Sequence, residues 1–121
     1  MKQVILFVDD DESITAISKQ ILTEAGHYVL GASSGNEAHA LLGIVSPDLL
    51  ITDLVMPDLE GLELIRLVVK SRPDLRVIPI SGEFEMLFLK VAEAFGAKAT
   101  LQKPFSPNQL VETASRVTAM D

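Results

Sequence analysis

The sequence predicts an α/β fold in which a doubly wound, five-stranded parallel sheet is built from five successive β-α units. Apolar runs of strand length alternate with segments of helical periodicity along the whole chain, which indicates a parallel sheet with helices on both faces. The runs Gln3–Val8 and Leu49–Asp53 contain almost no polar residues, as expected of strands covered on both faces. No linker, repeat or low-complexity segment interrupts the pattern, so the 121 residues are expected to form a single domain over 1–121.

The first unit consists of the strand Gln3–Val8 and a helix at Ser13–Ala25. Gly26 ends this helix, because glycine readily takes the left-handed conformation that follows many helix ends. Tyr28–Ala32 is rich in residues that favour strands and is the second strand. The apolar residues of the first helix that share one face are Ile14, Ile17, Ile21 and Leu22.

The middle of the chain holds a short helix at Asn36–Ile44, a strand at Leu49–Asp53 and a helix at Leu62–Lys70. Pro47 separates the first of these helices from the strand, and Pro73 follows the second helix. Proline lacks a backbone N–H and disfavours the helical conformation in the residue before it, so both positions mark boundaries.

The last two units begin with the strands Arg76–Ile80 and Thr100–Gln102, with a helix at Glu83–Phe95 between them. Ser106 then opens a final helix at Pro107–Ala119. Serine is a favourable residue at a helix N-cap, and proline suits the first helical position, so this helix start is well specified.

Charged side chains follow three of the predicted strands directly. Asp9 and Asp10 come after the first strand, Asp53 ends the third, and Lys103 follows the fifth. The carboxyl ends of parallel strands lie side by side, so these groups are expected to converge. Asp11 is assigned to the start of the following helix, where a carboxylate complements the helix dipole. Carboxylates opposite a fixed cation make a site for Mg²⁺ and a phosphoryl group.

Asp53 is the predicted nucleophile of this site. A carboxylate can accept a phosphoryl group when a divalent ion neutralises the phosphoryl oxygens and holds the donor in line. Lys103 can supply the fixed cation, and Ser81 can supply a hydroxyl at the end of the fourth strand. Gly82 leaves room for a phosphoryl group beside the backbone.

Together these residues resemble the receiver domain of two-component response regulators, over the whole chain. The matching segments are Val8-Asp9-Asp10, Asp53 with Met56-Pro57 and Gly61, Ser81-Gly82, and Lys103-Pro104-Phe105. Each segment alone is weak, but all of them in this order at strand ends make a strong signal. The resemblance implies the flavodoxin-like receiver fold.

The resemblance also implies a role for each matching residue. Asp53 is expected to be the phosphoacceptor, and Asp9 and Asp10 the acidic pair that binds Mg²⁺ together with Asp53 and the backbone carbonyl of Val55. Ser81 corresponds to the hydroxyl residue that reaches a phosphoryl oxygen. Lys103 corresponds to the lysine that pairs with the phosphoryl group, and the Lys103-Pro104 bond is expected to be cis.

The function implied by the resemblance is signalling. The domain would receive a phosphoryl group from a phosphohistidine of a partner histidine kinase or histidine phosphotransfer protein, and would catalyse its own dephosphorylation. The output would be a shift of the surface formed by helix 83–95, strand 100–102 and helix 107–119. Thr100 stands where the family often has an aromatic switch residue, so we expect no aromatic rotamer switch. Val55 is apolar where polar residues can orient attacking water, so we expect slow autodephosphorylation.

The predicted helix at residues 83–95 is unusually apolar, and Met86 and Leu89 fall outside its inward stripe. They are either ordinary scattered surface residues or a docking patch for a second copy or an output partner. Both alternatives remain open at the level of the sequence.

Composition excludes several other functions. The formal net charge is -7, which argues against direct nucleic-acid binding, and no apolar run approaches the ~20 residues needed to span a membrane. The chain has no cysteine, so thiol catalysis and disulfides are excluded, and with no targeting peptide recognised we expect a cytoplasmic location.

Two alternative functions compete with that of a phosphorylated receiver. Asp9-x-Asp11 followed by Ser13 loosely resembles the first motif of haloacid-dehalogenase-like phosphate hydrolases, with Asp9 as nucleophile. Such enzymes normally need a longer chain with a cap. The other alternative is a degenerate receiver that serves only as a docking domain, and the complete set of acids, hydroxyl and lysine argues against it.

Overall fold

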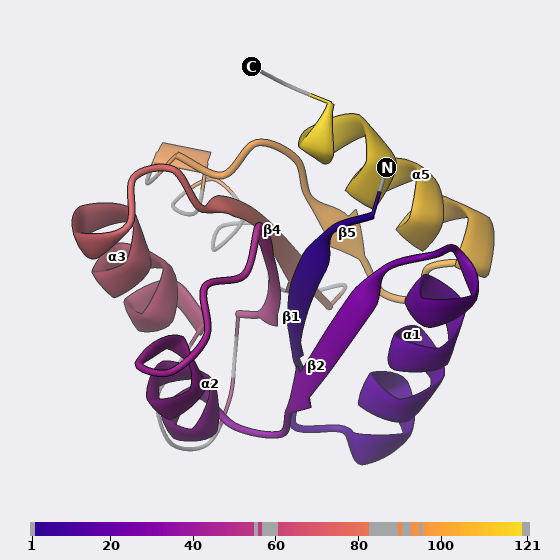
Figure 1. Cartoon of the computed structure of the whole chain (residues 1–121), viewed down its shortest axis with the longest axis horizontal. Coiled ribbons are helices and arrows are strands. Elements are labelled where there is room, and N and C mark those ends of the chain that lie inside the picture. Colours follow the sequence, from indigo (N-terminus) through magenta and orange to yellow (C-terminus); the bar gives the residue numbers. More distant parts are fainter. Residues whose placement is uncertain are drawn as a thin grey trace.

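The computed structural model describes residues 2–54, 56, 61–82, 90, 93–94 and 96–119. Within them, strands of one parallel sheet lie in the order β2-β1-β3-β4-β5 (Figure 1). The strands are β1 (Val4–Val8), β2 (Tyr28–Ala32), β3 (Leu49–Asp53), β4 (Arg76–Ser81) and β5 (Leu101–Gln102). The helices that lie within the described ranges are α1 (Glu12–Glu24), α2 (Gly35–Leu42), α3 (Gly61–Ser71) and α5 (Pro107–Thr118). The predicted doubly wound fold is confirmed.

The strand order reverses at β1, which pairs with β2 on one side and with β3 on the other. In this register Val8 lies opposite Thr52, and on the next pair of strands Asp53 lies opposite Ile80. The residues that follow β1 and β3 therefore emerge next to each other. This edge of the sheet, at the reversal of strand order, is where α/β proteins of this kind bind ligands.

Within the described residues, α1 and α5 lie on one side of the sheet, and α2 and α3 lie on the other (Figure 1). Successive strand residues point to opposite faces, so β1 divides its side chains between two separate cores. Ile5 and Phe7 pack in the core that includes α1 and α5, whereas Leu6 and Val8 pack in the core that includes α2 and α3. Apolar side chains therefore fill both faces of β1, and the charged residues Asp9 and Asp10 follow its last residue.

Side-chain caps determine where the helices start. The Asp11 side chain accepts hydrogen bonds from the N–H groups of Ser13 and Ile14, so α1 begins at Glu12, one residue before its predicted start. The N-cap predicted for the last helix is confirmed, because Ser106 and Gln109 form a reciprocal capping box ahead of α5.

The apolar face of α1 is not uniformly buried. Of the isoleucines predicted to share it with Leu22, Ile17 is 59% exposed, and Ser18 takes a fully buried position instead. Ser18 and Leu22 are one helical turn apart and form the row nearest the sheet and α5, which leaves Ile17 to one side. Burial on this helix is therefore decided by its rotation against its neighbours.

Several predicted boundaries shift by a residue or two. Tyr28–Ala32 and Leu49–Asp53 match the structure, whereas β4 extends to Ser81 and β5 begins at Leu101 rather than Thr100. The predicted helix at residues 83–95 lies largely outside the described residues, and so do Met86 and Leu89 of the predicted patch.

Candidate functional site: an acidic pocket at the strand ends

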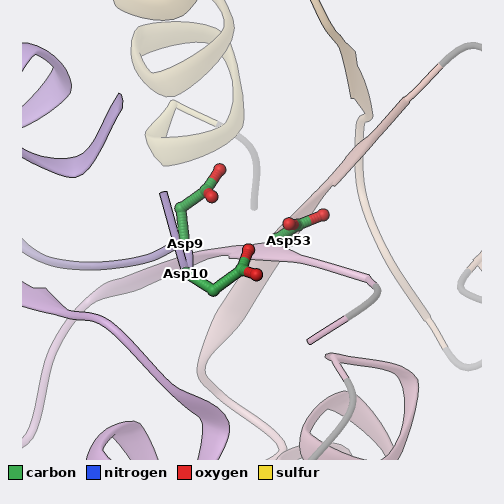
Figure 2. A group of neighbouring side chains, drawn as sticks. All are labelled: Asp9, Asp10 and Asp53. Carbon is green, nitrogen blue, oxygen red and sulfur yellow. The ribbon is translucent and has the colours of Figure 1, made fainter. Parts of the chain in front are cut away.

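The predicted convergence of charged residues is present in the structure. Asp9 directly follows β1, Asp53 is the last residue of β3, and Lys103 directly follows β5. Ligand atoms of Asp9, Asp10 and Asp53 all lie within 4.8 Å of one another (Figure 2). The Lys103 Nζ atom lies 2.9 Å from Asp9 Oδ2 and 3.4 Å from Asp53 Oδ2. One ammonium thus bridges two carboxylates from different strands.

The carboxylates differ sharply in burial. Asp9 is fully buried and Asp53 is 5% exposed, whereas Asp10 is exposed. Burial raises the pKa of Asp9 above its usual range, because the charged form loses its hydration. The Asp11 N–H, which donates to Asp9 Oδ1 at 2.9 Å, and the Lys103 charge both oppose this rise in pKa.

Lys103 remains charged within this group. Its side chain is 25% exposed, and loss of hydration alone would lower its pKa. The neighbouring carboxylates of Asp9 and Asp53 outweigh that effect and hold the pKa of Lys103 above its usual range. The pocket therefore contains a permanent cation that faces the predicted nucleophile.

Backbone groups hold Asp53 and the adjacent strands in place. The Leu54 N–H donates to Asp53 Oδ1 at 2.9 Å and also lies 3.1 Å from the Ile80 carbonyl oxygen. The Lys103 N–H donates to the Ser81 carbonyl oxygen at 2.8 Å, which ties the end of β4 to the residue that follows β5. The Lys103-Pro104 peptide bond is cis, as the resemblance implied.

Two buried polar atoms in the pocket lack a hydrogen-bond partner among the described residues. They are Ser81 Oγ and Asp9 Oδ2. Asp9 Oδ2 is compensated by its ion pair with Lys103 Nζ at 2.9 Å, whereas the Ser81 hydroxyl has no such compensation among the described residues. Buried polar atoms are normally satisfied, so the unpartnered Ser81 hydroxyl is available to a ligand that enters the pocket.

The donor set fits a magnesium ion. Mg²⁺ binds oxygen ligands and is commonly held by one or two carboxylates together with phosphate oxygens and waters. Three carboxylates with ligand atoms within 4.8 Å of one another supply this chemistry. Val55, whose carbonyl was predicted as a further ligand, lies outside the described residues.

One residue near the pocket was not predicted. The Thr15 hydroxyl, in the second turn of α1, donates to the Asp9 carbonyl oxygen at 3.0 Å. A threonine in the helix that follows the acids was visible in the sequence, but nothing in its pattern indicated that the hydroxyl would reach back past the helix start.

Comparison with known proteins identifies the class of protein that this fold and pocket define. The family model described as "Response regulator receiver domain" matches residues 5–115. The chain belongs to this family, and it is a phosphoacceptor module of two-component signal transduction rather than a classical enzyme. The haloacid-dehalogenase-like hydrolase and the degenerate docking domain are not favoured.

Individual relatives agree with this assignment. The chain is 32% identical over 119 residues to the chemotaxis protein CheY of Thermotoga maritima, covering 98% of this chain and 99% of that protein. The crystal structure of the receiver domain of NtrX from Brucella abortus matches with a TM-score of 0.92 at 30% identity, covering 97% of this chain and 99% of that one.

Larger regulators also contain a matching segment. The transcriptional regulator NtrC of Azospirillum brasilense is 38% identical over 112 residues, which is 93% of this chain and 23% of that protein. The chain thus spans about a quarter of the length of NtrC.

Among the residues that the structure describes, no helix is long and apolar enough to cross a membrane.

Proposed function

We propose that Asp53 accepts the phosphoryl group, in a Mg²⁺-dependent reaction with a phosphohistidine of a partner histidine kinase or histidine phosphotransfer protein. The observation that carries this proposal is the position of the Asp53 carboxylate, which is almost fully buried, 3.4 Å from Lys103 and beside Asp9 and Asp10. A carboxylate held next to a cation and two further acids is suited to phosphoryl transfer through a metal ion.

In this reaction the P–N bond to the donor histidine breaks and a P–O bond to Asp53 forms, while the released imidazole takes up a proton from solvent. Asp9, Asp10, Asp53 and the Val55 carbonyl would hold Mg²⁺, which neutralises charge on the phosphoryl oxygens. Before transfer the Lys103 ammonium is paired with Asp53 Oδ2 at 3.4 Å. After transfer the same ammonium faces the new phosphoryl group.

Ser81 would respond to phosphorylation. Its buried hydroxyl lacks a hydrogen-bond partner among the described residues and stands at the end of β4, next to the strand that carries Asp53. A phosphoryl oxygen on Asp53 would give this hydroxyl an acceptor. The resulting movement would bias the surface of helix 83–95, β5 and α5, with Met86 and Leu89 as a docking patch for a second copy or an output partner.

The test is phosphorylation with a small donor such as acetyl phosphate in Mg²⁺, followed by mass spectrometry of peptides. We expect modification at Asp53 that is lost in Asp53→Asn and is strongly reduced in Lys103→Ala. Asp48→Asn is a matched control, because Asp48 accepts from the Val4 N–H at the opposite end of the sheet. Modification at Asp9 instead of Asp53 would overturn the proposal and support the hydrolase alternative.

The rate of phosphate loss tests the proposed role of Val55. We expect phospho-Asp53 to decay slowly, because an apolar side chain two residues after the acceptor cannot orient an attacking water molecule. Val55→Asn should accelerate the decay, as followed by intact-protein mass spectrometry after removal of the donor. Loss of the phosphoryl group within seconds in the unmodified protein would refute this expectation.

We further propose that the chain is a single domain over 1–121, that it is cytoplasmic, and that it has an output patch on helix 83–95. If Met86 and Leu89 form a docking patch, Met86→Ser and Leu89→Ser should reduce self-association of the phosphorylated domain, as measured by analytical ultracentrifugation, or binding of an output partner. Unchanged association and partner binding in both variants would remove the patch from the proposal.

A further inference from the structure

The Thr15 hydroxyl makes an unusual contact for a helical threonine. Threonine in a helix commonly bonds to the carbonyl three or four residues earlier in the same helix. The Thr15 N–H already donates to the Asp11 carbonyl oxygen at 3.1 Å, as the helix requires. Its hydroxyl passes this carbonyl and donates to the Asp9 carbonyl oxygen at 3.0 Å, which lies before the N-cap and outside the helix.

The carbonyl that accepts from Thr15 belongs to the peptide bond between Asp9 and Asp10. This peptide is planar, so the direction of its carbonyl determines where the Asp10 Cα atom lies relative to Asp9. The other groups of Asp9 are held as well: its N–H lies 3.2 Å from the Ala32 carbonyl oxygen, and its Oδ1 accepts from the Asp11 N–H. Thr15 supplies the restraint on the side of Asp10.

The second branch of the Thr15 side chain lies against β2. A Cβ atom added to Gly31 would come within 2.9 Å of the Thr15 Cγ2 atom, so the methyl group fits closely over this glycine. A β-branched side chain has few χ1 rotamers in a helix, and here the methyl contact and the hydroxyl bond agree on one of them. The hydroxyl is thus aimed at the Asp9 carbonyl by packing as well as by hydrogen bonding.

We propose that Thr15 is a positioning residue for the metal site, which holds the Asp9–Asp10 peptide so that both carboxylates face Asp53. The inference rests on the proposed binding of Mg²⁺ by these acids. Groups that orient metal ligands typically contribute about 10-fold or more to metal affinity. Thr15 would act by keeping the exposed Asp10 in a position to bind.

The test compares two substitutions by Mg²⁺ titration calorimetry without any phosphodonor. Thr15→Val keeps the branched shape and removes the hydroxyl, and we expect it to weaken Mg²⁺ binding about 10-fold. Thr15→Ser keeps the hydroxyl and should bind Mg²⁺ nearly as the unmodified protein does. Thr118→Val is the matched control, because it removes a hydroxyl bond to a backbone carbonyl in α5, away from the pocket.

Unfolding in urea without Mg²⁺ separates positioning from simple stability. If Thr15→Val lowers stability but leaves the Mg²⁺ dissociation constant unchanged, the residue is structural only and the proposal fails. If the unmodified protein binds no Mg²⁺, the proposed metal site fails together with this inference. If the unmodified protein binds Mg²⁺, Asp10→Asn weakens binding and Thr15→Val does not, only the inference about Thr15 fails.

A double-mutant cycle tests whether the contact between the Thr15 methyl group and Gly31 helps to aim the Thr15 hydroxyl. Gly31→Ala should displace the Thr15 side chain and weaken Mg²⁺ binding, because the new Cβ atom meets Thr15 Cγ2. The same Gly31→Ala change should have a much smaller effect in the Thr15→Ser background, which lacks the Cγ2 atom. Equal effects in the two backgrounds would show that Gly31 does not act through Thr15.

Discussion

Ser81 and Thr52 are both fully buried hydroxyl residues near the strand ends, but their hydroxyl groups are in opposite situations. The Thr52 hydroxyl donates to the Asp53 carbonyl oxygen at 2.9 Å, whereas the Ser81 hydroxyl has no hydrogen-bond partner among the described residues. A buried polar group without a partner loses its hydration without compensation, at a cost of about 1–3 kcal/mol. We therefore expect the Ser81 hydroxyl to lower the stability of the domain as long as no ligand supplies an acceptor.

This difference predicts opposite effects of two similar substitutions. Ser81→Ala should leave the free energy of unfolding unchanged or raise it by up to about 1 kcal/mol, because it removes the unsatisfied hydroxyl. Thr52→Val should lower it by about 1 kcal/mol, because it removes a hydroxyl that makes a hydrogen bond. Urea unfolding of both variants in metal-free buffer measures the two values, and a loss of stability in Ser81→Ala as large as in Thr52→Val would contradict the prediction.

The buried side chain of His27, at the end of the sheet opposite the pocket, should make the stability of the protein depend on pH. It is buried, and its Nδ1 accepts the Gln3 N–H at 3.1 Å, so it must be neutral on that nitrogen. Burial lowers the pKa of His27 below its ordinary value of 6.5. As the pH falls, the unfolded chain therefore takes up the His27 proton before the folded protein does. The stabilising contribution of neutral His27 is complete above about pH 6.5. It is lost as the pH falls from there through the lower pKa of the folded state.

We expect the unmodified protein to lose stability between about pH 7.5 and about pH 5 by an amount that His27→Gln reduces. The measurement is urea unfolding at a series of pH values without Mg²⁺. His39→Gln is the matched control, because His39 is exposed on α2. An identical pH slope in His27→Gln and the unmodified protein would show that His27 does not carry this dependence.

At the scale of the elements, α5 begins with a capping box. The Ser106 side chain accepts from the Gln109 N–H at 3.1 Å, and the Gln109 side chain accepts from the Ser106 N–H at 2.7 Å. This box satisfies two backbone donors that the helix itself cannot, just three residues after Lys103. The cap therefore supports the helix that follows the pocket's cation.

Ser106→Ala should lower the free energy of unfolding by about 1 kcal/mol, the usual cost of losing a side-chain N-cap. Ser106→Asp should retain most of the stability, because aspartate is an equally good cap. Thermal and urea unfolding of the two variants would decide the matter. If alanine and aspartate had the same effect, the contribution of Ser106 would not come from capping.

At the scale of the whole molecule, the pocket concentrates negative charge in a domain whose formal net charge is already -7. Lys103 compensates Asp9 and Asp53 in part, and a bound divalent cation would compensate the rest. A ligand that binds only the folded state raises stability by mass action. Mg²⁺ binding should therefore be measurable as a gain in global stability.

At Mg²⁺ concentrations about 100-fold above the dissociation constant, we expect a gain of about 2.7 kcal/mol in the free energy of unfolding. Asp10→Asn removes one proposed ligand and should lose most of this gain, and Asp48→Asn at the other end of the sheet should keep it. Differential scanning calorimetry with EDTA and with added Mg²⁺ gives the comparison. Equal shifts with Na⁺ at matched ionic strength would attribute the effect to screening alone.

The amino-acid sequence by itself determined the succession of strands and helices along the chain and the meeting of Asp9, Asp53 and Lys103. Hydrophobic periodicity identifies the elements, and a parallel sheet brings the carboxyl ends of its strands to one edge whatever the details of packing. The N-caps at Asp11 and Ser106 are equally local, because they depend on residues within one turn of chain.

Only the tertiary structure decided how α1 is rotated and what that rotation places beside the pocket. Ile17 is exposed while Ser18 is buried, and the Thr15 hydroxyl reaches Asp9 over Gly31, because α1 packs closely against β2 and α5. The burial of Asp9 and the exposure of neighbouring Asp10 follow in the same way. Such differences depend on contacts between segments far apart in sequence, which no local pattern of residue types can specify.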